Sequence, residues 1–282
     1  MTRPVIAAPA DVKRAARWHE GKGHHRIFGG ATPIGSCEAH FHDTYIIGYI
    51  RAGSAIALIN GEALELGPGK VLLVNPFDIV ECDSQPQFDY DVCYPDQAFM
   101  QQVLVANGGH GLITRFSRHL LEGKVALALG ALIVELFLPD QARSPDLIER
   151  EICALLAAQQ DLVVQARPQT DMPGFVVRAC DLIEQHLERP MSVAELSVMV
   201  GRSRSDFARV FRDAMGLPPS TYIRQLRLAR ALLRIREGES LADVALLYGF
   251  FDQAHFTRAF KRVYGTAPGR LARDISRCRA CG

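Results

Sequence analysis

The sequence lacks the features of secreted and membrane-spanning proteins. Its seven cysteines are an odd number without the regular spacing of a disulfide framework, so we expect reduced thiols. No apolar run reaches the ~18 residues that a membrane span requires, and the amino-terminal segment has no apolar core of a secretory signal. These absences predict a cytoplasmic protein.

A paired cysteine motif of the kind that binds zinc is also missing. The one C-x-x-C, Cys278 to Cys281, has no second pair, whereas a structural zinc site needs about four ligands. We therefore expect an inert tail here, and neither a resident metal nor a cofactor elsewhere in the chain.

The chain has almost no net charge, but its positive and negative residues are unevenly distributed along the sequence. The chain of 282 residues has a net charge of +1. Residues 172–282 hold 18 Lys and Arg against 11 Asp and Glu, a net charge of +7, whereas the remainder holds 14 against 20, a net charge of −6. A basic carboxy-terminal part joined to an acidic amino-terminal part is typical of a protein in which one domain faces phosphates.

The pattern of apolar residues predicts an α+β protein with two domains. Residues 25–93 contain short β-like runs (TYIIGYI, AIALI, EALEL, KVLLV) separated by turn signals, which predicts a small barrel or sandwich. Helical periods follow from about Asp96, one of them opening with the N-cap serine and proline of SPDLIER. We assign residues 1–160 to the first domain, 161–173 to a polar linker and 174–282 to a helical domain.

The helical domain contains one supersecondary unit twice, because many positions recur at a fixed spacing. The offset is 48 residues at first and becomes 49 after one extra residue in the second copy. The recurring positions are Ser192 with Ser240, Glu195 with Asp243, Gly201 with Gly249, Phe207 with Phe256, Arg209 with Arg258, Phe211 with Phe260, Gly216 with Gly265, and Pro219 with Pro268.

Each copy has the pattern of a helix–turn–helix, at about residues 192–215 (the first unit) and 240–264 (the second unit). A capping box opens the first helix, and a glycine suited to a left-handed turn ends it. The Phe pair spaced i, i+4 predicts that the second helix buries one face, which leaves the opposite face for a groove of nucleic acid. The polar residues of that face are Arg204, Ser205, Asp206, Arg209 and Arg212 in the first unit and Gln253, His255, Arg258, Lys261 and Arg262 in the second. Two helical hairpins without a ligand are the alternative.

The segment between the two units, PPSTYIRQLRLARALLRIRE, predicts a helix of about 18 residues, hence ~27 Å long. Its apolar stripe is Tyr222, Leu226, Ala229 and Leu233, and a neighbouring face carries Arg227, Arg230 and Arg234. A rod of this length can hold two units in successive major grooves, which are roughly 34 Å apart.

Residues 174–275 resemble the DNA-binding domain of the AraC/XylS family of bacterial transcription regulators, most closely in DVALLYGFFDQAHFTRAFKRVYGTAPGRL. The resemblance implies double-stranded DNA and bacterial RNA polymerase as partners, and an activating role in transcription. By position it implies base-facing roles for Ser205, Asp206, Arg209, Gln253, Ala254, His255 and Arg258. The two arginines and Gln253 carry most of this inference, because Ala254 and Asp206 distinguish bases poorly.

The stretch from GSCEAHFHD to NPFDIVECDS resembles the cupin-like effector domain of many such regulators. Metal-binding cupins use an HxH, a carboxylate and a further His, but this chain matches only His40 and His42, and Ile79, Val80 and Glu81 stand where the last His is expected. We therefore expect no metal. His40, His42 and Tyr45 are candidates for polar contacts with a small effector; a purely structural role and a bound metal remain the alternatives.

The helices between residues 97 and 160 resemble the dimerising helices of this family, and the apolar run VALALGALIVELFL favours a homodimer. The predicted function is a sequence-specific DNA-binding regulator that responds to an effector and is not an enzyme. Two alternatives stay open, a cupin-type metalloenzyme with an accessory helical domain and an effector-independent DNA-binding protein. Neither the effector nor the operator follows from the sequence.

Overall fold

A computed structural model describes residues 17–20, 26–29, 37–84, 88–107, 114–136, 143–159, 162–165, 172–189, 191–264 and 267–273. Three sequence predictions lie outside these residues: the C-x-x-C of Cys278 and Cys281, the match at Gly265, and the linker over 166–171. No helix in the described part of the chain has the length and apolar character needed to cross a membrane.

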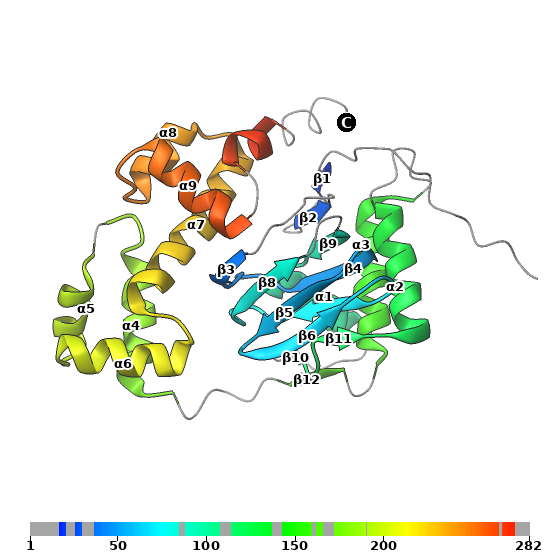
Figure 1. Ribbon diagram of the computed structural model, residues 1–282, viewed down its shortest axis with the longest axis horizontal. Helices are drawn as coiled ribbons and strands as arrows, with labels where there is room; N and C mark the ends of the chain where they lie inside the picture. The colour runs from blue at the N-terminus through cyan, green and yellow to red at the C-terminus, as the bar shows by residue number, and fades with distance from the viewer. Residues whose placement is uncertain are drawn as a thin grey trace, which may run out of the picture.

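Antiparallel sheets form the amino-terminal domain, as the alternation of short runs and turns predicts (Figure 1). The first sheet has the order β1 (Arg17–Glu20), β2 (Arg26–Gly29), β9 (Asp89–Tyr94), β4 (Ile46–Ala52), β7 (Val71–Val74), β11 (Leu120–Leu121). The second has the order β3 (Cys37–His40), β8 (Val80–Ser84), β5 (Ala55–Ile59), β6 (Glu62–Leu66). A separate pair consists of β10 (Thr114–Phe116) and β12 (Val163–Gln165).

Strand β12 lies inside the segment predicted as linker, so that prediction is wrong for residues 162–165. Val163, Val164 and Gln165 pair with β10, and Leu162 before them is buried in the core of the first domain. Two consecutive β-branched residues after a buried leucine favour an extended strand over a solvated linker.

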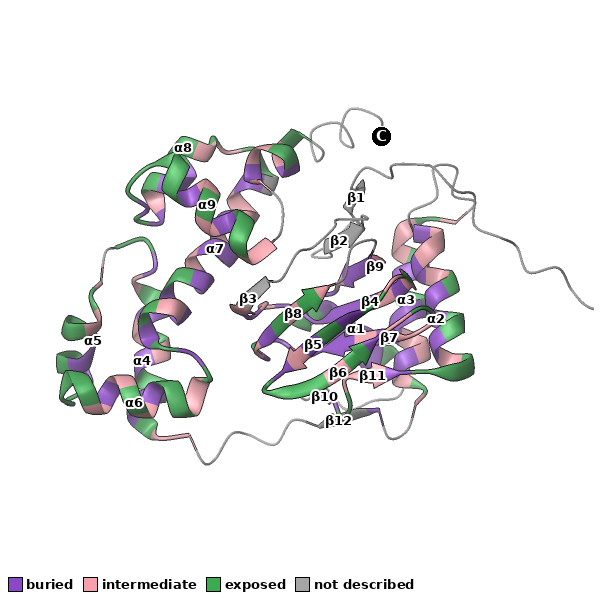
Figure 2. Ribbon diagram, in the orientation of Figure 1, coloured by how far each residue is buried: buried purple, intermediate pink, exposed green. Residues whose placement is uncertain are grey.

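Strand β4 is buried on both faces, and its side chains alternate between two cores. Ile46 and Ile50 face the second sheet, whereas Ile47 and its neighbour Tyr45 pack on the opposite side. Three helices cover that opposite side: α1 (Gln97–Ala106), α2 (Gly123–Leu136) and α3 (Pro145–Ala157). Helix α3 begins as predicted, with Ser144 as N-cap and a proline in the first turn. Figure 2 shows β4 buried along most of its length.

The carboxy-terminal domain is helical and contains both predicted units. Gly201 and Gly249 each adopt the left-handed conformation, with φ of 71° in both, and the capping box of Ser192 with Glu195 is complete. The helices are α4 (Gly174–Gln185), α5 (Val193–Met199), α6 (Arg204–Met215), α7 (Pro219–Glu237), α8 (Leu241–Leu247) and α9 (Gln253–Tyr264).

Two hydrophobic clusters cross from one domain to the other. One joins the space between the two sheets to residues of α7, α8 and α9. The other places Phe41, from the loop after β3, among the aromatic residues of α6 and α7. The domains therefore share cores and are packed together rather than merely tethered.

Candidate functional site

Helix α6 presents the predicted contact face of the first unit to solvent. Phe207 and Phe211 are fully buried, so the face that they define is fixed against the core. Arg209 lies on the opposite face and forms ion pairs with Asp206 (2.9 Å) and Asp213 (3.6 Å). Exposed pairs of this kind contribute only about 0–1 kcal/mol, so the guanidinium can be redirected to another acceptor. Arg204 and Ser205 are exposed, Asp206 is half-buried, and Arg212 is exposed near the end of the helix.

Helix α9 presents the corresponding face of the second unit. The Asp252 carboxylate accepts a hydrogen bond from the backbone of His255 (2.6 Å) and so caps the first turn of the helix. No ion pair involving Arg258 is present within the described ranges, in contrast to its counterpart Arg209. The predicted contact residues are all exposed: Gln253, Ala254, His255, Arg258, Lys261 and Arg262.

Helix α7 connects the two units, with α6 at one end and α8 and α9 at the other (Figure 1). Its 19 residues span about 28 Å. The arginines on its side face are half-buried and have partners within the protein. Arg227 donates to the carbonyls of Leu187 (3.0 Å) and Arg189 (2.8 Å), and Arg234 pairs with Glu239 (3.0 Å).

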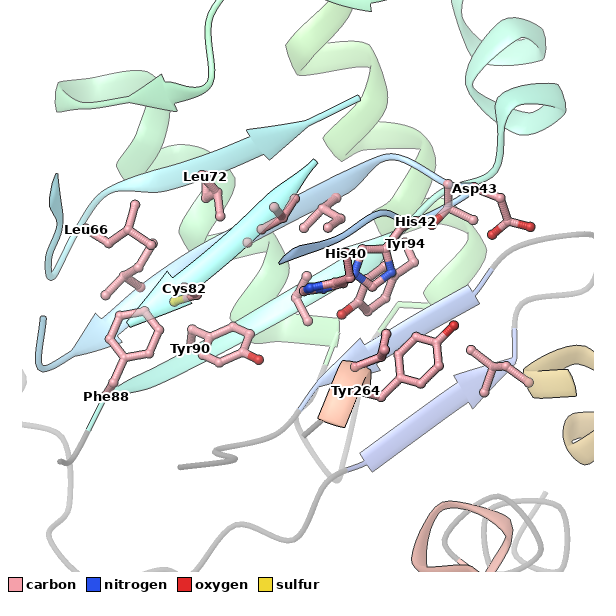
Figure 3. Close-up of a pocket in the computed structure, with 18 of the residues that line it drawn as sticks. His40, His42, Asp43, Leu66, Leu72, Cys82, Phe88, Tyr90, Tyr94 and Tyr264 are labelled. Atoms are coloured by element: carbon pink, nitrogen blue, oxygen red, sulfur yellow. The ribbon is translucent and has the colours of Figure 1, made fainter. Parts of the chain in front are cut away.

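A cavity of about 130 Å³ lies between the two sheets and is closed on one side by the helical domain. The sheets contribute apolar walls, and α7, α9 and the segment after α9 contribute the remainder. Figure 3 shows two different ends: leucines and aromatic rings gather at one, and two histidines with two tyrosines gather at the other. The labelled residues of the apolar end are Leu66, Leu72, Cys82, Phe88 and Tyr90, and those of the polar end are His40, His42, Tyr94 and Tyr264, with Asp43 beyond them.

The two histidines of the HxH line this cavity and contact each other, with 3.1 Å between their Nε2 atoms. Burial, and secondarily the charge of His40, lower the pKa of His42 well below its ordinary value, so this imidazole is neutral at pH 7. The rings of Tyr94 and Tyr264 lie 5.4 Å and 5.9 Å from the ring of His42.

Tyr45, the third predicted pocket residue, does not line the cavity. It follows Thr44 and precedes Ile46, which both face the cavity, so its own side chain points to the helix-covered side. There its ring packs against Phe116, 5.3 Å away. The two-residue period of the chain would have revealed this, because Tyr45 is out of step with the apolar residues of β4 that face inward.

Within the described residues, no three His, Cys, Asp or Glu side chains come together in a way that could hold a metal ion. That the protein carries no metal stays a prediction, which elemental analysis of the purified protein tests.

Sequence reasoning missed the junction formed by residues 39–43, which lies between the cavity and the helical domain. Buried Gln225 of α7 accepts a hydrogen bond from the backbone of Phe41 (3.0 Å) and donates one to the carbonyl of Ala39 (2.7 Å). The ring of Phe41 packs against Tyr222 (5.0 Å between centroids). A single polar residue inside an apolar helix stripe was the available signal, since such a group needs a buried partner.

An ion pair extends this junction. The Asp43 carboxylate lies 3.5 Å from the guanidinium of Arg230 on α7. Residues 39–43 therefore have two kinds of contact. The backbone of Ala39 and the side chains of Phe41 and Asp43 contact the helical domain. The side chains of His40, His42 and Asp43 line the cavity. A molecule bound at the polar end would touch the segment that fastens the two domains.

Comparison with protein families agrees with this division of the chain. Residues 30–156 match the family described as the AraC-like ligand binding domain, and residues 196–274 match the family described as a helix-turn-helix domain. The chain is 27% identical to the uncharacterized transcriptional regulator YbfI of Bacillus subtilis over 221 residues, which is 77% of this chain and 80% of that protein.

Other curated relatives match over a shorter part of the chain. The probable transcriptional regulator LumQ of Photobacterium leiognathi is 42% identical over 90 residues, 31% of this chain and 36% of its own length. The right origin-binding protein of Escherichia coli is 32% identical over 105 residues, 37% of this chain and 36% of its own length. This chain thus covers about a third of each of these two proteins.

Among solved structures, ToxT of Vibrio cholerae has a similar arrangement of both domains. The wild-type protein bound to an unsaturated fatty acid aligns with a TM-score of 0.54 and 16% identity, over 84% of this chain and 89% of ToxT. A second ToxT structure gives a TM-score of 0.55 and 12% identity, over 86% and 96%. At this identity the likeness concerns the fold alone.

Proposed function

The chain belongs to the AraC family of transcriptional regulators, and we propose that it binds one operator through both helix–turn–helix units and responds to a small molecule held between its domains. The observation that carries this proposal is that the cavity and the second unit share helix α9. Val263 and Tyr264, in its last turn, line the cavity, whereas its first turn presents the candidate base contacts.

Charge and geometry support DNA as the partner of the helical domain. Residues 172–282 carry a net charge of +7, which attracts phosphates. Arg209 and Arg258 each lie in the middle of an exposed helix face, where a guanidinium can donate to O6 and N7 of guanine. The length of α7 is compatible with the placement of α6 and α9 in successive major grooves. We propose Ser205, Gln253 and His255 as further base contacts, and Arg204, Lys261 and Arg262 as phosphate contacts.

A selection from randomised duplex DNA, with wild type and single variants, tests the two-unit arrangement. Arg209→Ala and Arg258→Ala should each relax base preference in one half of the operator, and the two halves should be about ten base pairs apart. Lys261→Ala is the matched control, because loss of a phosphate contact should weaken all sequences equally and reduce the salt dependence by about one unit. Loss of preference at the same base pairs in both arginine variants would refute the arrangement.

The chemistry of the cavity suggests an effector with an apolar body and one polar end. Its walls are apolar over most of their length, and its polar end offers imidazole and phenol groups that can share hydrogen bonds. An apolar cavity of about 150 Å³ accommodates a molecule the size of benzene. The fatty acid in the ToxT structure supports the idea that a regulator of this fold can hold an elongated apolar molecule.

Titration calorimetry of the full chain with hexanol, hexanoate and hexylamine, which are close to benzene in size, tests this part of the proposal. Neutral His42 and the carboxylate of Asp43 favour the alcohol over the carboxylate. Leu72→Phe, which adds volume to the cavity wall at a half-buried position, should weaken binding of all three without loss of DNA binding. If no apolar ligand binds, or if the Phe variant binds them as well as wild type, the effector does not occupy this cavity.

We further propose a homodimer, with helices α2 and α3 as its contact. Leu127 on α2 is 55% exposed and Leu147 on α3 is 58% exposed, and exposed leucines on neighbouring helices favour association. Contact with RNA polymerase, activation of transcription and a cytoplasmic location beside the DNA are part of the same proposal. Sedimentation of the chain with and without ligand separates a constitutive dimer from a ligand-dependent one. No observation favours an enzyme.

A further inference from the structure

Phe251, in the turn between α8 and α9, is the most exposed large hydrophobic residue in the described part of the chain, at 91%. The phenylalanine before it behaves in the opposite way. Phe250 is only 6% exposed, and its ring packs against Phe256 at 5.1 Å between centroids. The core of the second unit is therefore complete without Phe251, and packing gives no reason for an aromatic side chain at this position.

The internal repeat identifies Phe251 as the extra residue of the second unit. The backbone of Phe250 donates to Ala245 (2.9 Å), as the backbone of Arg202 donates to Ser197 (2.9 Å) in the first unit, so these two turns begin alike. The helix caps also correspond, since Ser203 caps α6 and Asp252 caps α9. One residue in the second turn has no counterpart in the first, and it is Phe251.

The position of Phe251 places it beside the candidate base contacts. It stands two residues before Gln253, and its backbone N–H donates to Nδ1 of His255 (3.4 Å). Because Nδ1 accepts this bond, Nε2 is the ring nitrogen that can donate to another group. The turn thus presents an amide, an imidazole donor and a bare phenyl ring at the same end of α9.

In the major groove of DNA, thymine alone presents a methyl group, and apolar side chains recognise it by contact. We propose that Phe251 contacts a thymine C5-methyl group in the operator half bound by the second unit and so adds a preference for thymine that the first unit lacks. This inference rests on the proposed function, since it requires that α9 enter the major groove.

Other exposed apolar residues of the two units do not share this argument. Val198 on α5 and Leu246 on α8 are both 76% exposed, and they occupy the same position in the two copies. They are therefore a property of the repeat and lie on the helix that precedes the turn. Leu246 provides the matched control, because Leu246→Ala removes an exposed apolar side chain from the same unit at a different place.

The probe is the duplex that wild-type protein selects from a random pool, resynthesised with single thymine-to-uracil replacements. Uracil pairs with adenine as thymine does but lacks the methyl group. Wild type should lose about threefold to fivefold in affinity at one or two replacements in the half bound by α9, as expected for one buried methyl group. Phe251→Ala should bind the unmodified duplex more weakly and be insensitive to those replacements, Phe251→Leu should retain part of the sensitivity, and Leu246→Ala should match wild type.

The outcomes separate the two proposals. If wild type selects no sequence at all, the proposed function fails and the inference fails with it. If wild type selects a sequence but Phe251→Ala keeps the same uracil profile, the methyl contact is refuted while the proposed function stands. If Phe251→Ala binds DNA as wild type does but no longer changes transcription, the ring contacts a protein and the inference is likewise overturned. Circular dichroism checks that each variant is folded. We expect all of them to fold, because the side chains of Phe251 and Leu246 are exposed.

Discussion

Replacement of Gln225 by alanine should loosen the packing of the two domains without unfolding either. Gln225 lies on α7 and is 3% exposed, and its amide makes two hydrogen bonds to the backbone of residues 39–41. Alanine leaves the N–H of Phe41 and the carbonyl of Ala39 without these partners. An unsatisfied buried polar group costs about 1–3 kcal/mol. Two groups lose their partners, but Ala39 is only half-buried, so we expect a loss of about 2–4 kcal/mol in the packing of the junction.

Hydrogen exchange at the amide of Phe41 reports this loss directly. A change of ~2 kcal/mol corresponds to roughly a 30-fold faster exchange, because each 1.4 kcal/mol is a factor of ten. Gln225→Met keeps the approximate shape of the side chain without its hydrogen bonds, and should resemble Gln225→Ala if the bonds matter more than the packing. Arg224→Ala, at an exposed position of the same helix, should exchange like wild type.

Three results would refute this reasoning. Fast exchange of the Phe41 amide in wild type would mean that the junction is open in solution. Equal protection in wild type and Gln225→Ala would mean that the bonds do not hold it. A free energy of unfolding that falls by the full amount in the isolated helical domain as well would place the effect within that domain instead of at the junction.

Three further predictions concern stability and DNA affinity. Burial raises the pKa of Glu149 to about 8, above its ordinary value of about 4.3. Between these two values the folded state holds a proton that the unfolded state has lost. The free energy of unfolding should therefore fall as pH rises from about 5 to 8, by up to ~1.4 kcal/mol per pH unit. Glu149→Gln should flatten this slope in urea titrations at several pH values. Gly130→Ala should destabilise the chain by about 1–3 kcal/mol in the same assay, because the added Cβ would lie within 3.0 Å of the Tyr49 ring. Asp213→Ala should raise DNA affinity by about twofold to fivefold in a gel shift, because it removes a negative charge and an ion pair that holds Arg209; unchanged or weaker binding would contradict a role of Arg209 in DNA contact.

Local signals in the sequence predict the two helix–turn–helix units well. Capping serines, the turn glycines Gly201 and Gly249, and the i, i+4 phenylalanine pairs act within a few residues of one another, so their consequences do not depend on the rest of the fold. The strands of the first domain follow from similar short-range patterns. The repeat supports this prediction further, because the same signals recur at matching positions of the two copies.

The contacts at the junction between the domains could not be predicted from such local signals. Phe41 and Gln225 are 184 positions apart, and their hydrogen bond depends on how two separately folded domains meet. The same limit explains Arg230, which the sequence places on a basic helix face but which the structure pairs with Asp43. Tyr45 is a different case, because the alternation of β4 was visible in the sequence and was not applied to it.

The two roles of residues 39–43 set a limit on how strongly an effector can act. A ligand shifts an equilibrium only by the difference between its affinities for the two arrangements. If the hydrogen bonds of Gln225 contribute about 2–4 kcal/mol to the packed arrangement, a ligand that opens the junction must bind the open form ~30-fold to 1,000-fold more tightly. A ligand that strengthens packing has an easier task, because Tyr264 of α9 already forms part of the cavity wall and adds contact area only while the domains are packed. If the cavity holds an effector, the geometry therefore favours one that holds the second unit against the first domain, an arrangement in which the contact face of α9 is already exposed.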